Sequence, residues 1–501
     1  MIMKRIIALL LVLLAAMPLA AAEVWDEPNW YEVFVRSYKD SDGDGIGDLN
    51  GLLSRLDYIR DMGWRGLWLM PVMPSPSYHK YDVTDYFDID GEYGTLEDMR
   101  ALTAACHEKG LRLIVDMPVN HTSTRHPWFQ AAAEALASSE DSTMVGYYNF
   151  SRAGGSGYTP LDGTEWYYEE RFSGGGMPDL NLDNPEVKDV IRRIFDFWLN
   201  DVGVDGFRLD AVTSYHTGEA KRNIALLAEL KAMAEQLKPD SFLVGECWAN
   251  LDVIANYYTS GVDAFFLFPA AQAEGFVVSS LRARKEPARR FATAYEKTLE
   301  AIPEVALAPF LCNHDTGRTV GLVQGRSNPA VAKFAEGLLG MLNGRVFTYY
   351  GEEIGMVGSG DDPNKRLAMY WSDDDMTDQP PGTTAVEYAY PSVAAQQTDP
   401  GSLLSYVRAV NEARLDFPEI SGGANAFILA EDSLCLMERT LSGESCRIAI
   451  NFSGKEAGRL SVGSWAIARD LEVGESAAAV SESDGEAWLT LPPYGIVILK
   501  D

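Results

Sequence analysis

Three carboxylates follow short apolar segments at separate places in the chain: Asp210, Glu246 and Asp315. A carboxyl group can act as a nucleophile when it is ionised, and as an acid when its surroundings keep it protonated. The sequence places no serine–histidine pair, cysteine-rich metal cluster or glycine-rich phosphate loop beside them. Carboxylates without those motifs indicate cleavage of a glycosidic bond, provided that the fold brings the three together.

Asp210 lies in the segment "GFRLDAV", where Arg208 precedes it by two residues. Side chains alternate between the two faces of a strand, so these two charges should point the same way. A buried ion pair usually gains little net stability, which favours a catalytic reason for keeping one, although a purely structural pair is the alternative. In the catalytic interpretation Arg208 keeps Asp210 ionised as a nucleophile. Glu246, near other negative charges in an apolar context, would then retain its proton and serve as the acid.

The elements that must position these residues alternate between strand-like and helical patterns from Trp30 to about Ile420. Eight strands with helices between them predict an α/β fold, a (β/α)8 barrel. The strand candidates are "WYEVFVRSY", "GLWLMPV", "LRLIVDMPV", "VDGFRLDAV", "SFLVGECW", "VDAFFLFP", "VALAPFLCNHD" and "RVFTYYGEEIG". In such barrels the chemistry lies at the carboxyl ends of the strands. Four of these ends carry polar groups, namely those with Asp116, Asn120 and His121, with Asp210, with Glu246, and with His314 and Asp315.

The spacing of strands and helices divides the chain into parts. Residues 121–184 are rich in Gly, Tyr and Ser and interrupt the alternation after the third strand, which predicts an inserted B domain. The barrel is therefore expected in two pieces, residues 23–120 and 185–420. From residue 421 to 501 the helical pattern stops and short strands follow, which predicts a C-terminal antiparallel β-sandwich domain.

The motifs "DMPVNH", "GFRLDAV", "GECW" and "NHD", in this order and at these strand ends, resemble the conserved regions of glycoside hydrolase family thirteen, the α-amylase family. The resemblance extends over nearly the whole mature chain. It implies a retaining double displacement with Asp210 as nucleophile, Glu246 as general acid/base and Asp315 as the residue that grips the distorted sugar.

The resemblance also implies which residues bind the sugar in the cleavage subsite. Those expected are Arg208, His121 and His314, together with His79 and Tyr81 of "YHKYD". Tyr81 would stack on the apolar face of the ring. Asp82 is expected to pair with Arg366, whose segment "RLAMYW" is similar to the "R-x-P-M-x-W" stretch of α-glucosidases, with Ala368 in place of the proline.

The stretch "DSDGDGIGD" has the ligand spacing of a calcium-binding loop. Asp40, Asp42, Asp44, the Ile46 carbonyl and Asp48 occupy positions one, three, five, seven and nine of an EF-hand-type loop. Gly51 stands where an EF-hand has its last glutamate, so we expect a structural Ca²⁺ site of another kind, and the alternative is a solvated acidic turn. Relatives in the family place calcium in this loop. Asn120 and Asp179 match ligands of a second calcium site in the family, but Ser214 replaces its histidine.

The segment "MPDLN", Met177 to Asn181, resembles a group between neopullulanases and oligo-1,6-glucosidases. We therefore expect an α-amylase-type enzyme that hydrolyses α-1,4-glucosidic bonds in starch, maltodextrins and related α-glucans, with no organic cofactor. The alternatives are a neopullulanase or maltogenic amylase, and an exo-acting α-glucosidase. Non-catalytic relatives, such as the subunits of amino-acid transporters, lack the carboxylates and carry a membrane helix, so a glycan-binding homologue is disfavoured.

The beginning of the chain predicts export. Basic Lys4 and Arg5 precede a short apolar stretch that ends in small residues, which is typical of a signal peptide over residues 1–22, cut after Ala22. We therefore expect a secreted or periplasmic monomer with no membrane anchor. The net charge of −31 disfavours nucleic acid as a partner. Of the five cysteines only Cys435 and Cys446 lie close enough in sequence to suggest a disulfide, which the sequence leaves open.

Overall fold

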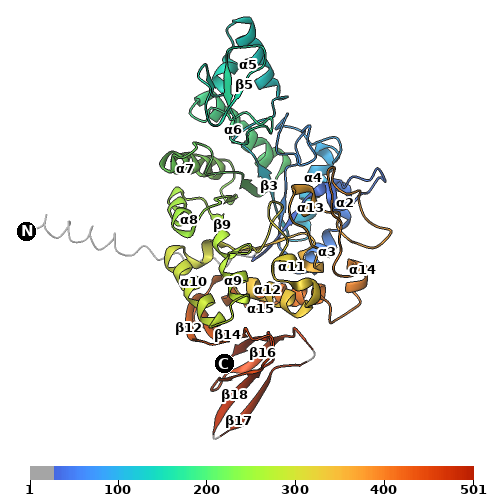
Figure 1. The fold of residues 1–501 in the computed structure, drawn as a ribbon, viewed down its shortest axis with the longest axis vertical. Coiled ribbons are helices and arrows are strands. Elements are labelled where there is room, and N and C mark those ends of the chain that lie inside the picture. Colours follow the sequence, from blue (N-terminus) through green and yellow to red (C-terminus); the bar gives the residue numbers. More distant parts are fainter. Residues whose placement is uncertain (1–27, 475, 484) are drawn as a thin grey trace, which may run out of the picture.

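A barrel of eight parallel strands forms the centre of the computed structural model, which describes residues 28–474, 476–483 and 485–501 (Figure 1). Its strands are β1 (Asn29–Val33), β2 (Gly66–Leu69), β3 (Arg112–Met117), β7 (Gly206–Leu209), β8 (Phe242–Gly245), β9 (Ala264–Phe266), β10 (Leu307–Ala308) and β11 (Val346–Tyr349). Neighbours in the chain pair in that order, and β1 also pairs with β11. The backbone N–H of Arg345 donates to Leu307 and that of Phe347 to Pro309, which closes the barrel between β10 and β11. The predicted (β/α)8 fold is confirmed.

Helices follow the barrel strands. They are α2 (Leu49–Ser54), α3 (Leu56–Asp61), α4 (Leu96–Glu108), α6 (Pro185–Asp196), α7 (Ala220–Leu237), α8 (Leu251–Tyr257), α9 (Phe276–Leu281), α10 (Pro287–Ala301), α11 (Thr319–Leu322), α12 (Pro329–Gly340), α13 (Asp362–Lys365), α14 (Val393–Gln396), α15 (Leu403–Asp416) and α16 (Glu419–Gly422). Local sequence sets several ends: Thr95 caps α4 in a capping box with Asp98, and Asn184 caps α6. A π-helical segment continues α6 to Val202 and ends at Gly203, whose φ of +90° suits glycine.

The B domain rises from the barrel between β3 and α6, at the top of Figure 1. It contains α5 (Pro127–Ser138) and a three-stranded antiparallel sheet, in the order β4 (Phe150–Ser151), β6 (Tyr167–Glu169) and β5 (Tyr158–Pro160). Two isolated bridges lie within this segment, between His121 and Asp179 and between Tyr148 and Leu180. The insertion after the third strand agrees with the prediction, whereas its helix was not predicted.

The C-terminal domain packs two antiparallel sheets. One has the order β12 (Ala424–Glu431), β13 (Leu434–Leu441), β14 (Glu444–Asn451), β19 (Ile496–Lys500) and β16 (Ala466–Leu471); the other has the order β15 (Gly458–Ser461), β18 (Glu486–Leu491) and β17 (Ala479–Ser483). Along β14, Ile448 and Ile450 belong to the main core shared with the barrel, while Ala449 between them belongs to a second core inside the domain. This alternation gives the larger sheet two buried faces.

The disulfide suggested for Cys435 and Cys446 is not formed. On neighbouring strands Cys435 lies opposite Ile450, whereas Cys446 lies opposite Arg439, so the register separates the two sulfur atoms. All five cysteines are free and buried. In the part of the chain that the structure describes, no helix is long and apolar enough to cross a membrane. The predicted signal peptide lies outside the described residues.

Candidate active site

A cavity of about 370 Å³ opens at the carboxyl ends of the barrel strands. It brings together all three predicted catalytic carboxylates and four predicted sugar ligands. Its lining consists of Asp210, Glu246, Asp315, His79, Tyr81, His121 and Arg366, with Met177 of the MPDLN segment, and with Phe172, Trp248 and Asp362, for which the sequence analysis predicted no role. Residues from several strand ends and from the B domain therefore share one hollow, as the barrel topology required.

Arg208 joins two of these carboxylates from below the cavity. It lies on β7 opposite Asp116 on β3, and both side chains are fully buried. Its Nη1 donates to Asp116 Oδ1 at 2.9 Å and to Asp210 Oδ1 at 2.5 Å. Its Nη2 lies 3.1 Å from Glu246 Oε2. The expected contact with Asp210 is present, and the same guanidinium also holds Glu246 beside it.

Glu246 is built to retain a proton near neutral pH. Burial raises its pKa to about 7, and the charges of Asp210 and Asp315 act in the same direction, against Arg208. The sequence argument named the neighbouring charges, but burial is the larger cause. Glu246 Oε2 also accepts the backbone N–H of Ala211 at 2.9 Å. Ala211 has a φ of +46°, a strained conformation for a residue with a Cβ atom, directly after Asp210.

Asp315 has the opposite tendency. Burial by itself would raise its pKa, but His314 and Arg366 outweigh burial and hold the pKa far below its usual range. His314 Nε2 lies 3.0 Å from Asp315 Oδ2, and Arg366 Nη2 donates to Asp315 Oδ1 at 2.9 Å. One cavity thus holds a carboxyl group that favours its proton and another that favours its charge, which is the combination acid–base chemistry needs.

The loop after β2 supplies Tyr81 and His79. Lys80, with a φ of 65°, anchors this loop through ion pairs of 2.8 Å with Asp90 and Glu92. The Tyr81 ring stacks on His314, and its hydroxyl lies 2.7 Å from His314 Nε2 and donates to Asp116 Oδ2 at 3.0 Å. The aromatic wall of the cavity is thereby tied to the charged groups beneath it.

Two expectations for the sugar ligands need correction. Asp82 does not pair with Arg366, because its carboxylate accepts hydrogen bonds from the hydroxyls of Ser75 and Ser77 while Arg366 is engaged by Asp315. Arg208 and His314 are fully buried beneath the cavity and do not line it, so they act on its lining. His121 does line the cavity, as predicted for a sugar ligand.

The acidic loop after β1 gathers three carboxylates. Oxygen atoms of Asp40, Asp42 and Asp48 lie within 4.8 Å of one another. Asp44 lies outside this group, and its Oδ1 accepts the backbone N–H of Ile46 at 2.7 Å. Clustered carboxylate oxygens are the donors that Ca²⁺ prefers, so this set fits the ion.

The pair Asn120 and Asp179 does not fit a second calcium ion. Asp179 Oδ1 accepts from Asn120 Nδ2 at 3.0 Å and Oδ2 from the backbone N–H of Arg171 at 3.1 Å. Burial raises the pKa of Asp179 to about 7. Arg171 Nε also donates to Ser214 Oγ at 3.2 Å, which places a cationic side chain where the family has its histidine.

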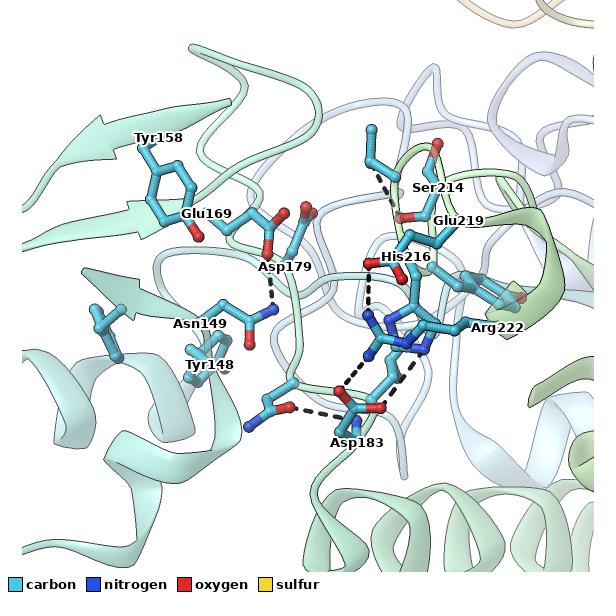
Figure 2. A pocket seen from close by; sticks show the side chains of 15 residues that line it. Tyr148, Asn149, Tyr158, Glu169, Asp179, Asp183, Ser214, His216, Glu219 and Arg222 are labelled. Carbon is cyan, nitrogen blue, oxygen red and sulfur yellow. Dashed lines mark hydrogen bonds and ion pairs between the residues drawn. The ribbon is translucent and has the colours of Figure 1, made fainter. Parts of the chain in front are cut away.

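The polar cavity of about 440 Å³ beside Asp179 does not change this conclusion (Figure 2). Its acidic side chains already have partners: Asn149 donates to Glu169 at 2.8 Å, and Arg222 pairs with both Asp183 and Glu219. The donor set is therefore largely satisfied by the protein itself.

Comparison with known proteins decides the family. Residues 32–423 match the model of the α-amylase catalytic domain. The chain belongs to the α-amylase family. Alpha-amylase 3 of Dictyoglomus thermophilum is 37% identical over 434 residues, which cover 85% of this chain and 84% of the relative. The structure of Eubacterium rectale Amy13B superposes with a TM-score of 0.90 at 39% identity, covering 96% of each chain.

More distant members of the α-amylase family carry other activities in their names. An oligo-1,6-glucosidase from Parageobacillus thermoglucosidasius is 28% identical over 86% of this chain and 91% of its own length. The protein is thus an enzyme of glycoside hydrolase family thirteen, and the choice among the activities of that family has to be argued from the site.

Proposed function

We propose that the protein is a retaining glycoside hydrolase of the α-amylase type, which cleaves α-1,4-glucosidic bonds in starch and maltodextrins. One observation carries the proposal: Arg208 contacts both Asp210 and Glu246 at the floor of a cavity that also contains Asp315. One guanidinium holds both carboxyl groups at the same floor, which supports a double displacement in which the two groups act at one anomeric carbon.

In the first step the Asp210 carboxylate attacks the anomeric carbon, and the bond from that carbon to the leaving oxygen breaks as Glu246 transfers its proton to this oxygen. A glucosyl ester on Asp210 results. In the second step Glu246, now ionised, removes a proton from water, whose oxygen attacks the same carbon and releases Asp210. Asp315 holds the distorted ring, and its negative charge stabilises the oxocarbenium-like transition state in both steps.

Two exposed aromatic side chains favour a long substrate over a single terminal glucose. Phe172 is 38% exposed and Trp248 is 50% exposed, and both line the cavity. Trp248 stacks on Phe268 with centroids 4.8 Å apart, and Phe172 lies edge-on to His121. Trp248 follows Glu246 by two residues in the chain. Fixed, exposed rings offer stacking surfaces for further sugars of a chain.

The second candidate is an exo-acting α-glucosidase of the oligo-1,6-glucosidase type, which the relative from Parageobacillus thermoglucosidasius favours. A neopullulanase or maltogenic amylase is a further alternative. A time course of products from amylose and pullulan separates the candidates. Mixed oligomers early in the amylose digest support the α-amylase assignment. Glucose alone from the start, or rapid cleavage of pullulan, would replace it.

The catalytic roles are tested with purified Glu246→Gln and Asp210→Asn. Both variants should release reducing sugar from soluble starch at least a thousandfold more slowly than the wild type, because each removes a group that acts in the chemical step. NMR of the first product should show the α-anomer. Equal rates for Glu246→Gln and wild type, or a β-anomeric first product, would refute the proposal.

The proposal extends to calcium and to location. We propose that the loop of Asp40, Asp42 and Asp48 binds a structural Ca²⁺ ion, which would neutralise three close negative charges and brace the segment between β1 and α2. Export is supported by the basic and apolar pattern of the first 22 residues. It suits an enzyme whose polymeric substrate lies outside the cell.

A further inference from the structure

Glu32 is a buried carboxylate that the mechanism above does not use. It lies next to the carboxyl end of β1, is 1% exposed and does not line the cavity. Its Oε1 lies 2.5 Å from Nδ1 of His314, which comes from the segment after β10. The contact joins the inner wall of the barrel to the floor of the active site.

The other ring nitrogen of His314 contacts two residues that line the cavity. Its Nε2 lies 3.0 Å from Asp315 Oδ2 and 2.7 Å from the Tyr81 hydroxyl. A histidine that lies between two carboxylates at ion-pair distance is stabilised as the imidazolium, in which both nitrogen atoms carry protons. The geometry therefore describes an imidazolium between two carboxylates, Glu32 behind it and Asp315 in front.

The electrostatics agree with this geometry. Burial would lower the pKa of His314, but Asp315 and Glu32 outweigh burial and raise the pKa to about 9. The other groups that face this pair are Arg208 and Tyr349 near Glu32, and Tyr81 with the edge of the Trp68 ring near His314. Two positive charges lie nearby: Arg208, which Asp116, Asp210 and Glu246 surround, and Arg366, which donates to the His314 carbonyl and to Asp315.

We propose that Glu32 is a positioning residue: it holds His314 as an imidazolium whose Nε2 lies 3.0 Å from Asp315 Oδ2, and so keeps Asp315 charged and in place against the sugar. The inference rests on the role proposed for Asp315 above. Stability alone is a weak reason to bury such a pair, because desolvation offsets most of the attraction. If Glu32 acts through His314, the buried pair has a function, and its loss should lower kcat to an extent that depends on pH.

Glu32→Gln tests this directly, because the amide keeps the shape of the side chain and can still accept from Nδ1–H, but lacks the charge. The pKa of His314 should then fall below 8. The ratio of wild-type to variant kcat should be near one at pH 5, where both forms hold the imidazolium, and rise to about tenfold at pH 8. Glu32 also interacts with Arg208, which contacts Glu246, so the pKa of Glu246 is fitted from each protein's own pH profile and the ratio is corrected for any difference.

Glu353→Gln is the matched control. Glu353 is also fully buried, follows β11 and accepts hydrogen bonds from the hydroxyls of Tyr31 and Tyr58, but does not line the cavity or contact His314. This variant should leave the ratio of kcat independent of pH, whatever it does to the melting temperature. A ratio for Glu32→Gln that is equally independent of pH would overturn the inference.

A second measurement does not depend on activity. The chain has six histidines, so histidine-selective ¹⁵N labelling gives few NMR signals, and a His314→Gln sample identifies those of His314. At pH 8 both of its nitrogen atoms should be protonated in the wild type and only one in Glu32→Gln. An unchanged imidazolium in Glu32→Gln refutes the inference. Failure of the proposed function would appear separately, as an active Glu246→Gln.

Discussion

Arg366 Nη2 donates to Asp315 Oδ1 over 2.9 Å, and Nε of the same side chain donates to the backbone carbonyl of His314. The guanidinium therefore holds both the charge of Asp315 and the backbone that carries it. Arg366 lies at the end of α13, in a segment that is separate from the barrel strands. A residue predicted as a sugar ligand is thus also a support for the third carboxylate.

Replacing Arg366 should affect the chemical step more than binding. Arg366→Ala leaves Asp315 with His314 as its remaining partner, and kcat on soluble starch should fall roughly a hundredfold. Asp362 provides a control, because it lies 3.5 Å from Arg366 Nη2 and is half exposed, so Asp362→Asn should change kcat less than threefold. Equal losses in the two variants would show that Arg366 has no particular role.

Activity should decline as the pH rises through about 7. The acid must be protonated in the first step, and burial raises the pKa of Glu246 to about 7, so the competent fraction is large below this pH and small above it. The profile of kcat/KM against pH measures this ionisation in the free enzyme.

Asp116→Asn checks that this limb belongs to Glu246. Asp116 competes for Arg208, so its neutralisation leaves more positive charge facing Glu246 and lowers the pKa of that acid. The alkaline limb should move to lower pH by about one unit. A shift to higher pH would contradict the assignment.

Calcium should stabilise the fold through the acidic loop. Removing the ion with a chelator should lower the melting temperature, and calcium at a hundred times its dissociation constant should restore about 2.7 kcal/mol. Asp42→Asn should abolish this response, whereas Asp44→Asn, which lies outside the carboxylate group, should retain it. If the chelator leaves the melting temperature of the wild type unchanged, the proposed calcium site is refuted.

Truncation of the exposed aromatic residues should selectively weaken the binding of long substrates. Trp248→Ala and Phe172→Ala each remove a stacking surface, so KM for a long maltooligosaccharide should rise about three- to tenfold. Cleavage of a short activated glucoside should hardly change. Val386, 52% exposed but not part of the cavity lining, supplies Val386→Ala as the control, with no effect on either substrate.

The barrel and its catalytic carboxylates could be predicted from the sequence because their signals are local. Apolar runs ending in Asp210 or Glu246 mark a strand and its polar end in the same few residues, and parallel strands bring those ends to one face. The B-domain helix was missed because its alanine-rich pattern follows a proline inside a segment of low periodicity.

Side-chain partners were harder to predict, because they depend on long-range geometry. Asp82 accepts hydrogen bonds from two serines of its own loop and does not pair with Arg366. The strand register places Cys435 opposite Ile450 and Cys446 opposite Arg439, so the two cysteines do not meet. Glu32 gave no signal of its own, since a single acid in an apolar strand becomes meaningful only when His314, 282 residues away, is seen beside it.

The larger sheet of the C-terminal domain is buried on both faces, and one of them rests on barrel helices through contacts such as Phe452 with Phe291 and Phe334. Such a sheet cannot be trimmed off without stripping the hydrophobic cover from α10 and α12. A gene shortened at the domain border should therefore yield insoluble material instead of a smaller working enzyme. The β-sandwich therefore covers an apolar surface of the barrel helices, and the two domains depend on each other for solubility.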